Sequence, residues 1–390
     1  MGNNCYNNFS EQNTELKMDI QQKYSRNARL QNLLNNSKNE KIFMKKKVEN
    51  KLSIETSEKK LLYSFLEKDK EKVESIFGLK NIGLTCYMNS FLQLLFHCPK
   101  FLTELKKCEY EATYTNIIRK LINIEKNPNN ENNLYKFKNS LKIISLQYSE
   151  FIQSDSQKFG IDLINSIIAE IKNEKSFFTT ESISETNHSS KINPQEEYKY
   201  FLEKYQNDLI SLEKMFLINE YKIYNKKNNK EIRFESSLNI DLTIPNRNIE
   251  ICDQIKFTLN ELLDYKYKTV KNNCLKIKMC NFPDILIITI IRTILGEKNN
   301  LCYIEYPETL LELQKYADNT ISNFDKSEYV LFGVNKKEGY YRESGHYFCE
   351  IKINNIWYEF NDSIVTPNIN FRNISNQVVG LFYAKKNLYN

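Results

Sequence analysis

The sequence predicts an α+β fold, because helical spacing dominates its first half and strand patterns dominate its second half. The clearest helix covers residues 159–173, where four isoleucines fall on one helix face. The clearest strands are 234–244, which alternates apolar and polar side chains, and 282–293, a nearly continuous apolar run. Such a run is typical of a strand that is buried on both faces. Helices that come before the strands, rather than alternating with them, favour α+β.

The remaining elements are expected in chain order. Helical spacing also marks the stretch after Cys86 and two further segments, 114–126 and 135–146. The polar stretch 179–197 is expected to be a loop within an insert near 175–200. From about residue 213 the pattern turns to strands, and the later ones are expected at 329–336, 346–353, 356–360 and 378–385.

The chain is expected to contain one globular domain, 74–388, preceded by a polar, basic extension over 1–73 that is partly helical or disordered. Formal net charge is +6, and Lys and Arg outnumber Asp and Glu mainly within this extension. The domain itself is near neutral and shows no basic stripe, so no nucleic-acid partner is expected. The opening residues MGNNCY leave a second interpretation of the extension open, in which Gly2 and Cys5 are acylated. The acylation motif is incomplete, because Tyr6 replaces the usual Ser or Thr.

Composition also limits the cellular setting. The longest apolar run, near 285–291, is much too short to cross a bilayer, so no transmembrane segment is expected. The nine cysteines are odd in number and irregularly spaced, and the polar start does not resemble a signal peptide. We therefore expect reduced thiols in a cytoplasmic or nuclear protein.

One cysteine has a placement that suggests chemistry. Cys86 follows a loop containing Gly and Thr and immediately precedes an apolar run with helical spacing. A thiol at a helix N-terminus is favoured as the thiolate, since the helix dipole and unpaired N–H groups stabilise negative charge there. Cys86 is therefore a candidate nucleophile.

A nucleophilic cysteine needs a base, and the chain has three histidines. His97 would lie roughly 16 Å from Cys86 along the same helix, too far to reach the thiol, and is expected to be a packing residue or a C-terminal cation. His188 falls in the polar insert. His346 follows Gly345 at the start of a strand, which would hold its ring rigidly. It is the remaining candidate base, with simple packing at a sheet end as the alternative.

A predicted hairpin supplies a partner for His346. Asn354 and Asn355 form a plausible two-residue turn between 346–353 and 356–360, since Asn tolerates positive φ. Pairing about this turn places Asn361 diagonally across from His346 on the same face, within reach of the ring. Asp362 would point to the other face, and a one-residue change in the turn would exchange the two.

These motifs resemble the ubiquitin-specific proteases, which are papain-like cysteine deubiquitinases. GLKNIGLTCYMNSFLQLLF resembles the family's cysteine box, and the stretch from YVLFGVNK to NDSIVTP resembles its histidine box. QSDSQKF, FPDILIITIIR and VVGLFYAK resemble three further family motifs, in family order from about 74 to 388. The resemblance implies a papain-like fold with a helical thumb, a β-rich palm and fingers.

The resemblance also implies a catalytic set and an activity. Cys86 would be the nucleophile, His346 the general base and Asn361 its orienting partner, with Asp362 as the alternate third member. Asn81 would match the oxyanion-hole residue. The implied activity is thiol-dependent hydrolysis of the bond after the C-terminal Gly of ubiquitin on protein conjugates, by a monomer that binds ubiquitin and ubiquitinated proteins.

Four residues would contact the substrate by the same resemblance. Gln153 belongs to the matching motif, Asp155 would grip the Arg-containing tail of ubiquitin, and Gly345 and Tyr347 would line the channel for its Gly-Gly end. No cofactor is implied. Many members bind zinc through two CxxC pairs, but this chain has no CxxC, so no metal is expected.

Three positions depart from the family pattern. Lys158 stands where the family has Glu, Leu84 where it has Asn or a small residue, and Lys337 where it has a non-catalytic His. Lys158 and Leu84 favour one alternative function, a ubiquitin-binding scaffold with little or no turnover. A peptidase for a ubiquitin-like modifier is a further alternative.

Overall fold

The computed structural model describes residues 76–111, 116–172, 186–188, 193–226, 229–245, 255–268, 274–292, 300–309, 311–321, 328–339, 341 and 344–389. Apart from Ile76, all of them belong to one structural unit, Phe77–Asn390. The predicted extension over 1–73, with Gly2 and Cys5, lies outside the described residues.

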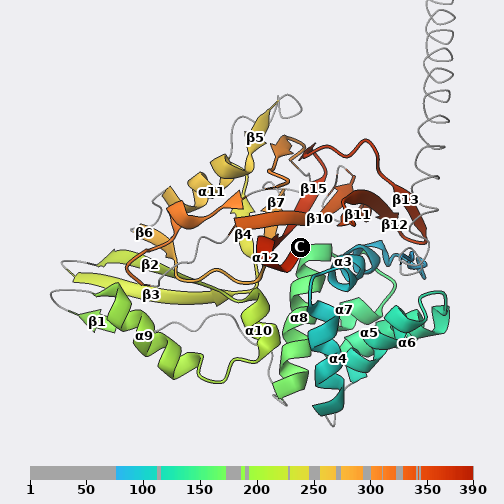
Figure 1. The fold of residues 1–390 in the computed structure, drawn as a ribbon, viewed down its shortest axis with the longest axis horizontal. Helices are drawn as coiled ribbons and strands as arrows, with labels where there is room; N and C mark the ends of the chain where they lie inside the picture. The colour runs from blue at the N-terminus through green and yellow to red at the C-terminus, as the bar shows by residue number, and fades with distance from the viewer. Residues whose placement is uncertain are drawn as a thin grey trace, which may run out of the picture. The chain divides into compact units, whose positions relative to one another are not determined.

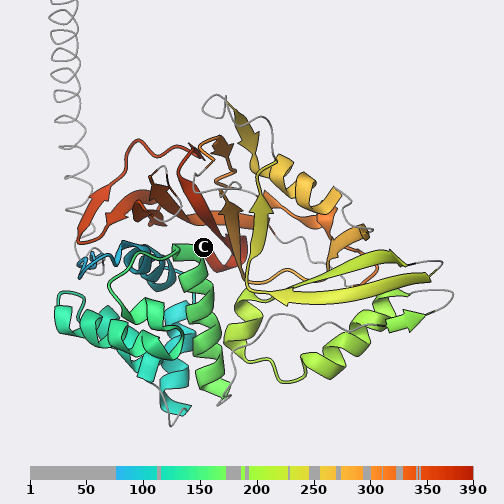
Figure 2. The same cartoon turned by 180° about the vertical axis from the view of Figure 1, so that it is seen from behind.

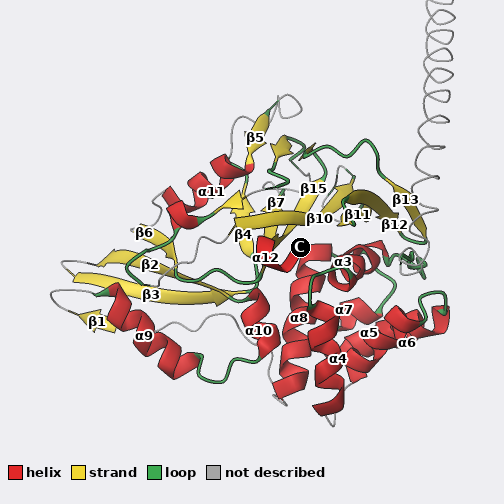
Figure 3. Ribbon diagram, viewed as in Figure 1, coloured by secondary structure: helices red, strands yellow, loops and turns green. Residues whose placement is uncertain are grey.

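Helices gather in the first half of this unit and strands in the second, as Figures 1 and 3 show. The first helical group contains α3 (Cys86–Phe96), α4 (Phe101–Glu111), α5 (Asn116–Lys126), α6 (Glu131–Ser140), the 3₁₀ turn η1 (Leu141–Ile143), α7 (Leu146–Ser149) and α8 (Ser156–Lys172). It packs against one side of the strand-rich part in both front and back views (Figure 2). The α+β prediction is confirmed.

The largest sheet holds most of the later strands. Its order is β13-β12-β11-β10-β15-β7-β4, and β9 also pairs with β10. These strands are β4 (Ile240–Thr243), β7 (Ile285–Ile291), β9 (Leu311–Glu312), β10 (Glu328–Glu338), β11 (His346–Ile353), β12 (Ile356–Asn361), β13 (Ile364–Pro367) and β15 (Val378–Lys385). Only β4 and β7 pair in parallel within it among the described strands. Most of β7 is buried, as its apolar sequence predicted.

Two smaller sheets complete the described strands. One has the order β1-β3-β2-β6 and the other β14-β8-β5. Their strands are β1 (Thr186–His188), β2 (Ile218–Lys226), β3 (Asn229–Ser237), β6 (Cys274–Met279), β5 (Lys256–Thr258), β8 (Tyr303–Glu305) and β14 (Ile374–Ser375). Of the remaining helices, α9 (Pro194–Tyr205), α11 (Leu259–Lys268) and the 3₁₀ turn η3 (Gln314–Tyr316) contact strands of these two sheets. The short α10 (Ser211–Phe216) lies against α4 and β7, and α12 (Lys386–Tyr389) follows β15. The β2–β3 ribbon extends away from the first helical group (Figure 1).

Some sequence expectations were wrong in their details. The stretch 179–197 was expected to be a loop, but it contains β1 and the start of α9. Asn193 caps α9 by accepting the Gln195 N–H, and Pro194 occupies the first turn, where its missing N–H costs nothing. The helix expected at 135–146 instead begins at Glu131 and ends at Ser140. The helices α10 and α11 interrupt the region expected to form strands.

The first helix of the group, α3, is enclosed by its neighbours. All of its residues are buried. A Cβ on Gly160 of α8 would come within 2.0 Å of the Phe91 ring, and one on Gly333 of β10 within 2.4 Å of Leu94. Phe91 also packs edge-on against Phe382 of β15. Missing side chains at the two glycines therefore let α8 and the sheet approach α3 closely.

We expect Gly160→Ala to lower the free energy of unfolding. Alanine in a helix interior ordinarily gains about 1 kcal/mol over glycine. Overpacking a buried site costs roughly 1–3 kcal/mol, and Phe91 is fully buried, so the steric cost should win. Urea unfolding followed by fluorescence of Trp357, the chain's one Trp, measures the change. Asn123→Ala, at an exposed position of α5, is the control and should not be destabilising; equal stability of Gly160→Ala and wild type would contradict the packing argument.

Candidate active site

Cys86 is the first residue of α3, as predicted, and 3% of it is exposed. Thr85 precedes it at the N-cap, and the backbone oxygen of Thr85 accepts the N–H groups of Met88 and Asn89. The positive end of the helix dipole and the unpaired N–H groups of the first turn lie at this position. The thiol therefore lies where a nucleophilic cysteine would be stabilised.

The side chain of Gln153 covers this thiol. Its Oε1 lies 3.9 Å and its Nε2 3.7 Å from Cys86 Sγ. The same Nε2 donates to the backbone oxygen of Gly345, at 3.2 Å. Because Gly345 precedes His346, Gln153 brings the loop that carries His346 to the start of α3.

His346 and Asn361 are joined by a hydrogen bond. Nε2 of the ring lies 2.7 Å from Asn361 Oδ1. The hairpin has the predicted register, since Cys349 pairs with Phe360 and Ile353 pairs with Ile356. Asn354 and Asn355 have φ values of 50° and 65°, which are typical of a type I′ turn. The turn chemistry thus places Asn361 beside His346.

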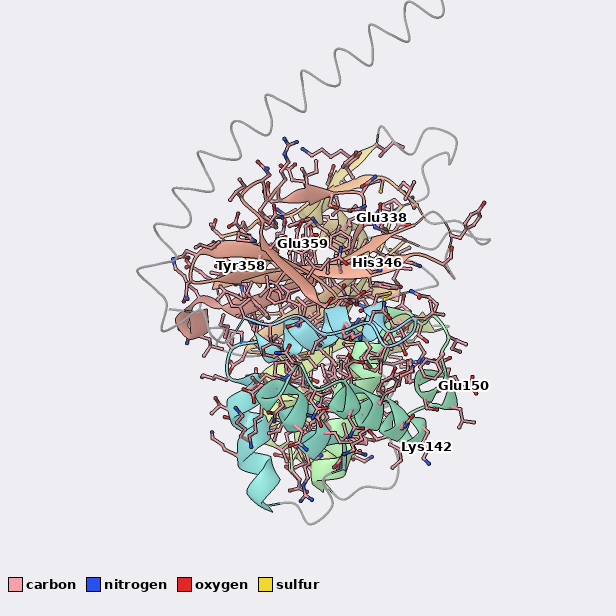
Figure 4. All side chains as sticks on the ribbon, turned by 90° about the vertical axis from the view of Figure 1, so that its right-hand side faces the viewer. Lys142, Glu150, Glu338, His346, Tyr358 and Glu359 are labelled. Carbon is pink, nitrogen blue, oxygen red and sulfur yellow. The ribbon has the colours of Figure 1, made fainter. Side chains whose placement is uncertain are left out.

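This hydrogen bond also determines the tautomer that the ring can adopt. Asn361 Oδ1 is an acceptor, so His346 Nε2 carries the proton that it receives. Nδ1 is then the nitrogen that can accept the thiol proton. No hydrogen bond joins the ring to Cys86 within the described residues, and such bonds often tighten only when substrate binds. Figure 4 shows His346 in the strand-rich part with Glu338, its partner across the β10–β11 ladder, and Glu150 in the helical part.

Asp362, the alternate third member, turns to other partners. It has a positive φ of 52°. Its Oδ2 accepts from Asn81 Nδ2 at 3.0 Å, and its Oδ1 accepts from Asn89 Nδ2 at 2.8 Å. The ring of His346 is thus held by Asn361, and the carboxylate of Asp362 holds two asparagines near the start of α3.

Asn81, the candidate oxyanion donor, is fixed through both ends of its amide. Its Oδ1 accepts from the backbone N–H groups of Gly83 and Thr85, each at 3.1 Å, and from Thr85 Oγ1 at 3.2 Å. One N–H of its amide points at Asp362, which leaves the second available as a donor. Sequence reasoning missed Asn89; the available signal was a polar residue inside an apolar helix.

The candidate substrate-binding residues converge on the start of α8. Asp155 Oδ1 accepts the Lys158 N–H at 2.8 Å, which caps the helix, and Asp155 Oδ2 accepts from Tyr347 Oη at 3.4 Å. Tyr347 is buried, and burial raises the pKa of its phenol. Gly345 has a φ of +136°, and a Cβ there would come within 2.3 Å of Glu338 O, so only glycine fits.

The structure shows the exposure and the contacts of the three residues that depart from the family pattern. Lys158 is exposed and forms a 2.9 Å ion pair with Asp162 one turn later on α8. Leu84 is 51% exposed with a φ of 51°, a conformation that costs a leucine roughly 1–2 kcal/mol. Lys337 is buried, and its ammonium lies 5.4 Å from the centre of the Tyr347 ring.

The other two histidines lie elsewhere. His97 is the C-cap of α3, its Nδ1 lies 2.8 Å from Gln93 O, and its ring packs 5.0 Å from that of Phe360. Burial lowers the pKa of His97, so the ring is neutral at pH 7, which favours the packing alternative over the cation. His188 is in β1. Only His346 lies next to a residue that Gln153 links to Cys86.

Cys274 begins β6 and Cys280 follows it, and both are buried. Burial raises the pKa of the Cys280 thiol, which disfavours the thiolate that a metal would need. Within the described residues no three His, Cys, Asp or Glu side chains cluster as metal ligands would, and no helix there has the length and apolarity to cross a membrane.

Known proteins resemble this chain over most of its length. Ubiquitin carboxyl-terminal hydrolase Usp2 of Drosophila melanogaster is 22% identical over 342 residues, which cover 81% of this chain and 35% of that protein. Ubiquitin carboxyl-terminal hydrolase 4 of Arabidopsis thaliana is 26% identical over 318 residues, which cover 75% of this chain and 85% of that protein. The chain thus spans little more than a third of the fly protein's length.

Solved structures and a family model agree with these relatives. The SAGA Ubp8/Sgf11/Sus1/Sgf73 DUB module contains a chain with a TM-score of 0.59 and 20% identity, covering 80% of this chain and 68% of that one. The same module bound to ubiquitin aldehyde gives a TM-score of 0.58. This likeness shows the papain-like fold that the sequence predicted. The family model described as ubiquitin carboxyl-terminal hydrolase matches residues 77–383, which include every candidate site residue, so the chain belongs to the ubiquitin carboxyl-terminal hydrolase family.

Proposed function

We propose that the chain is a thiol-dependent deubiquitinase, which hydrolyses the bond between the C-terminal Gly of ubiquitin and a lysine of a protein conjugate. The observation that carries this proposal is the His346–Asn361 hydrogen bond, which lies next to Gly345, the residue that Gln153 links to Cys86. A binding module would not need both a thiol at a helix N-terminus and an imidazole oriented by an asparagine. Family membership supports the same activity.

The proposed reaction has two stages. His346 takes the thiol proton of Cys86, and the thiolate attacks the carbonyl carbon of the terminal Gly. As the C–N bond breaks, His346 gives its proton to the departing lysine amine, which leaves a thioester on Cys86. Water, losing a proton to His346, then attacks the thioester. As the C–S bond breaks, His346 gives that proton to the Cys86 sulfur, and the carboxylic acid formed on ubiquitin loses its proton to solvent.

Three further residues have roles that follow from their contacts. Asn361 holds the His346 ring through Nε2 and so favours the tautomer in which Nδ1 can accept the thiol proton. Asn81 would donate its second amide N–H to the oxyanion, a contribution of about 3 kcal/mol in other acyl-transfer enzymes. Asp362 acts one step away, because its carboxylate holds the Asn81 amide in place.

The substrate tail would enter between α8 and the Gly345 loop. Asp155, at the start of α8, is exposed and can pair with an arginine of the tail, while Gly345 and Tyr347 bound the narrow part next to the thiol. Gln153 covers Cys86 and has to yield as the Gly-Gly end enters. Lys158 does not cancel the charge of Asp155 outright, because its ammonium pairs with Asp162.

Two other functions remain as alternatives. A ubiquitin-binding scaffold with little or no turnover is favoured by the strained backbone of Leu84, close to Asn81. This strain would raise the free energy of the conformation in which Asn81 is aligned for catalysis. A peptidase for a ubiquitin-like modifier is compatible with Lys158, which changes the charge beside the proposed tail channel.

A ubiquitin probe with a C-terminal electrophile distinguishes these functions. Wild-type protein should be labelled, and Cys86→Ala should not, because the probe bonds to the nucleophile. Cys98→Ala, which changes a buried thiol just beyond the same helix, is the matched control and should label normally. Binding without labelling would favour the scaffold, labelling by a modifier probe instead would favour the other peptidase, and labelling of Cys86→Ala would overturn the nucleophile.

Replacing the proposed base should separate chemistry from binding. His346→Ala is expected to lower kcat for a fluorogenic ubiquitin amide by roughly 10²–10⁴-fold, because proton transfer is lost. The dissociation constant for ubiquitin should change little. His188→Ala, on β1 of another sheet, serves as the control. Near-normal turnover in His346→Ala would refute the assignment.

Asn361 and Asp362 should act by different routes. In single-turnover labelling, Asn361→Ala is expected to slow acylation in the wild type but to add little in a His346→Ala background, since it acts through that ring. Asp362→Ala should slow acylation in both backgrounds, since it acts through Asn81. The reverse pattern would make Asp362 the third member of the catalytic set.

A further inference from the structure

A lysine with no counter-ion is buried in the helical group. Lys138 lies near the end of α6, and only 1% of it is exposed. Its ammonium donates to two backbone oxygens, that of Tyr148 at 3.2 Å and that of Glu150 at 2.6 Å. The ammonium also lies 5.2 Å from the centre of the Phe151 ring, within the range of a cation–π contact. No carboxylate of the described residues pairs with it.

Stability does not explain this side chain. A buried charge is costly unless it is paired, and an apolar side chain of similar length would fill the same space. Burial accordingly lowers the pKa of the Lys138 ammonium. The contacts of this lysine are with the backbone and ring of the stretch from Tyr148 to Phe151, which indicates that its effect is on the conformation of the chain there.

The stretch in contact with Lys138 runs from α7 into the segment 150–155, which links α7 to α8 and contains neither helix nor strand. At its start Lys138 binds Glu150 O and the Phe151 ring, and at its end Asp155 caps α8. Between these two anchors lies Gln153, whose amide contacts Cys86 Sγ and donates to Gly345 O. The anchors therefore set the position of the side chain that covers the thiol.

Phe151 connects the same segment to the loop before Cys86. Its ring lies so close to the backbone of Gly83 that a Cβ on Gly83 would come within 2.7 Å of Phe151 Cδ1. Gly83 donates its N–H to Asn81 Oδ1, so Phe151 borders the loop that holds the candidate oxyanion donor. Phe151 is nonetheless 56% exposed, so its contacts with the Lys138 ammonium and with Gly83 are important for the position of its ring.

We propose that Lys138 is a positioning residue for the hydrolysis: it acts through Phe151 on the Gly83 loop and through the 150–155 backbone on Gln153. The expected loss of activity rests on the proposed function, whereas the expected change in the 150–155 segment does not. The segment, once released from Lys138, would allow Phe151 to leave Gly83 and Gln153 to leave Cys86. Both the oxyanion loop and the entry to the thiol would then lose their support.

The first test compares Lys138→Met with Lys172→Met. Lys172, on α8, is also largely buried and pairs with Glu213 at 2.9 Å, so its loss controls for removal of a buried ammonium. In Lys138→Met we expect kcat/KM for a fluorogenic ubiquitin amide to fall roughly 10–100-fold, as a small misplacement of reacting groups does. Lys172→Met should change kcat/KM by less than a few-fold. Equal losses in both variants would show a merely structural role and overturn the proposal.

A double-mutant cycle tests the route. Phe151→Ala alone should lower kcat/KM, and adding Lys138→Met should then cost much less than it does in the wild type. Full additivity would show that Lys138 does not act through Phe151. If Lys138→Met does not fold, the single variants Lys138→Arg and Phe151→Leu are compared instead. Lys138→Arg keeps the charge and the hydrogen-bond donors, so it should retain more activity than Phe151→Leu. The opposite order would overturn the proposal.

Two measurements without ubiquitin keep this inference separate from the proposed function. Hydrogen exchange should speed up in the 150–155 segment of Lys138→Met, while exchange in α6 and α8 stays as in wild type. Iodoacetamide modification of Cys86, read by mass spectrometry, should change rate in Lys138→Met and not in Lys172→Met. If wild-type protein hydrolysed no ubiquitin amide, the proposed function would fail; unchanged exchange and alkylation in Lys138→Met would instead defeat the Lys138 proposal.

Discussion

The close packing around α3 is the constraint on which the rest of the site depends. Every residue of this helix is buried, and two neighbours approach it through glycines, Gly160 of α8 and Gly333 of β10. Because close-packed interiors tolerate little displacement, the position of Cys86 at the end of the helix is set by the core rather than by the surface. The proposed nucleophile is thus held in a fixed position, and groups that come from other elements must be brought to it.

The polar residues of α3 recruit those groups. Asn89 donates to the backbone oxygens of Leu79 and Lys80 and to Asp362, and Gln93 donates to the backbone oxygen of Phe77. One buried helix therefore holds both the chain that leads to the oxyanion loop and the turn after Asn361. Since a buried amide without partners is costly, these bonds favour one arrangement of helix, loop and hairpin.

The opposite wall of the site is held less firmly. His346 comes from a well-formed hairpin, but Gln153 comes from the segment 150–155, which has no regular structure. That segment depends on end anchors, a buried lysine at one end and a helix cap at the other. The proposed nucleophile and base thus lie on well-packed elements, whereas Gln153, which covers the thiol, lies on a segment that Lys138 anchors.

Sequence by itself determined what depends on local chemistry. The helix after Cys86, the Asn354–Asn355 turn and the His346–Asn361 pairing follow from apolar spacing and from positive φ at two asparagines. The tertiary structure alone decided what depends on distant contacts. Asp362 holding Asn81, and Lys138 holding the cover of the thiol, join residues that no periodicity connects. A side chain's partner across the fold is chosen by packing and by the need to pair buried polar groups, and neither is written in the spacing of residues along the chain.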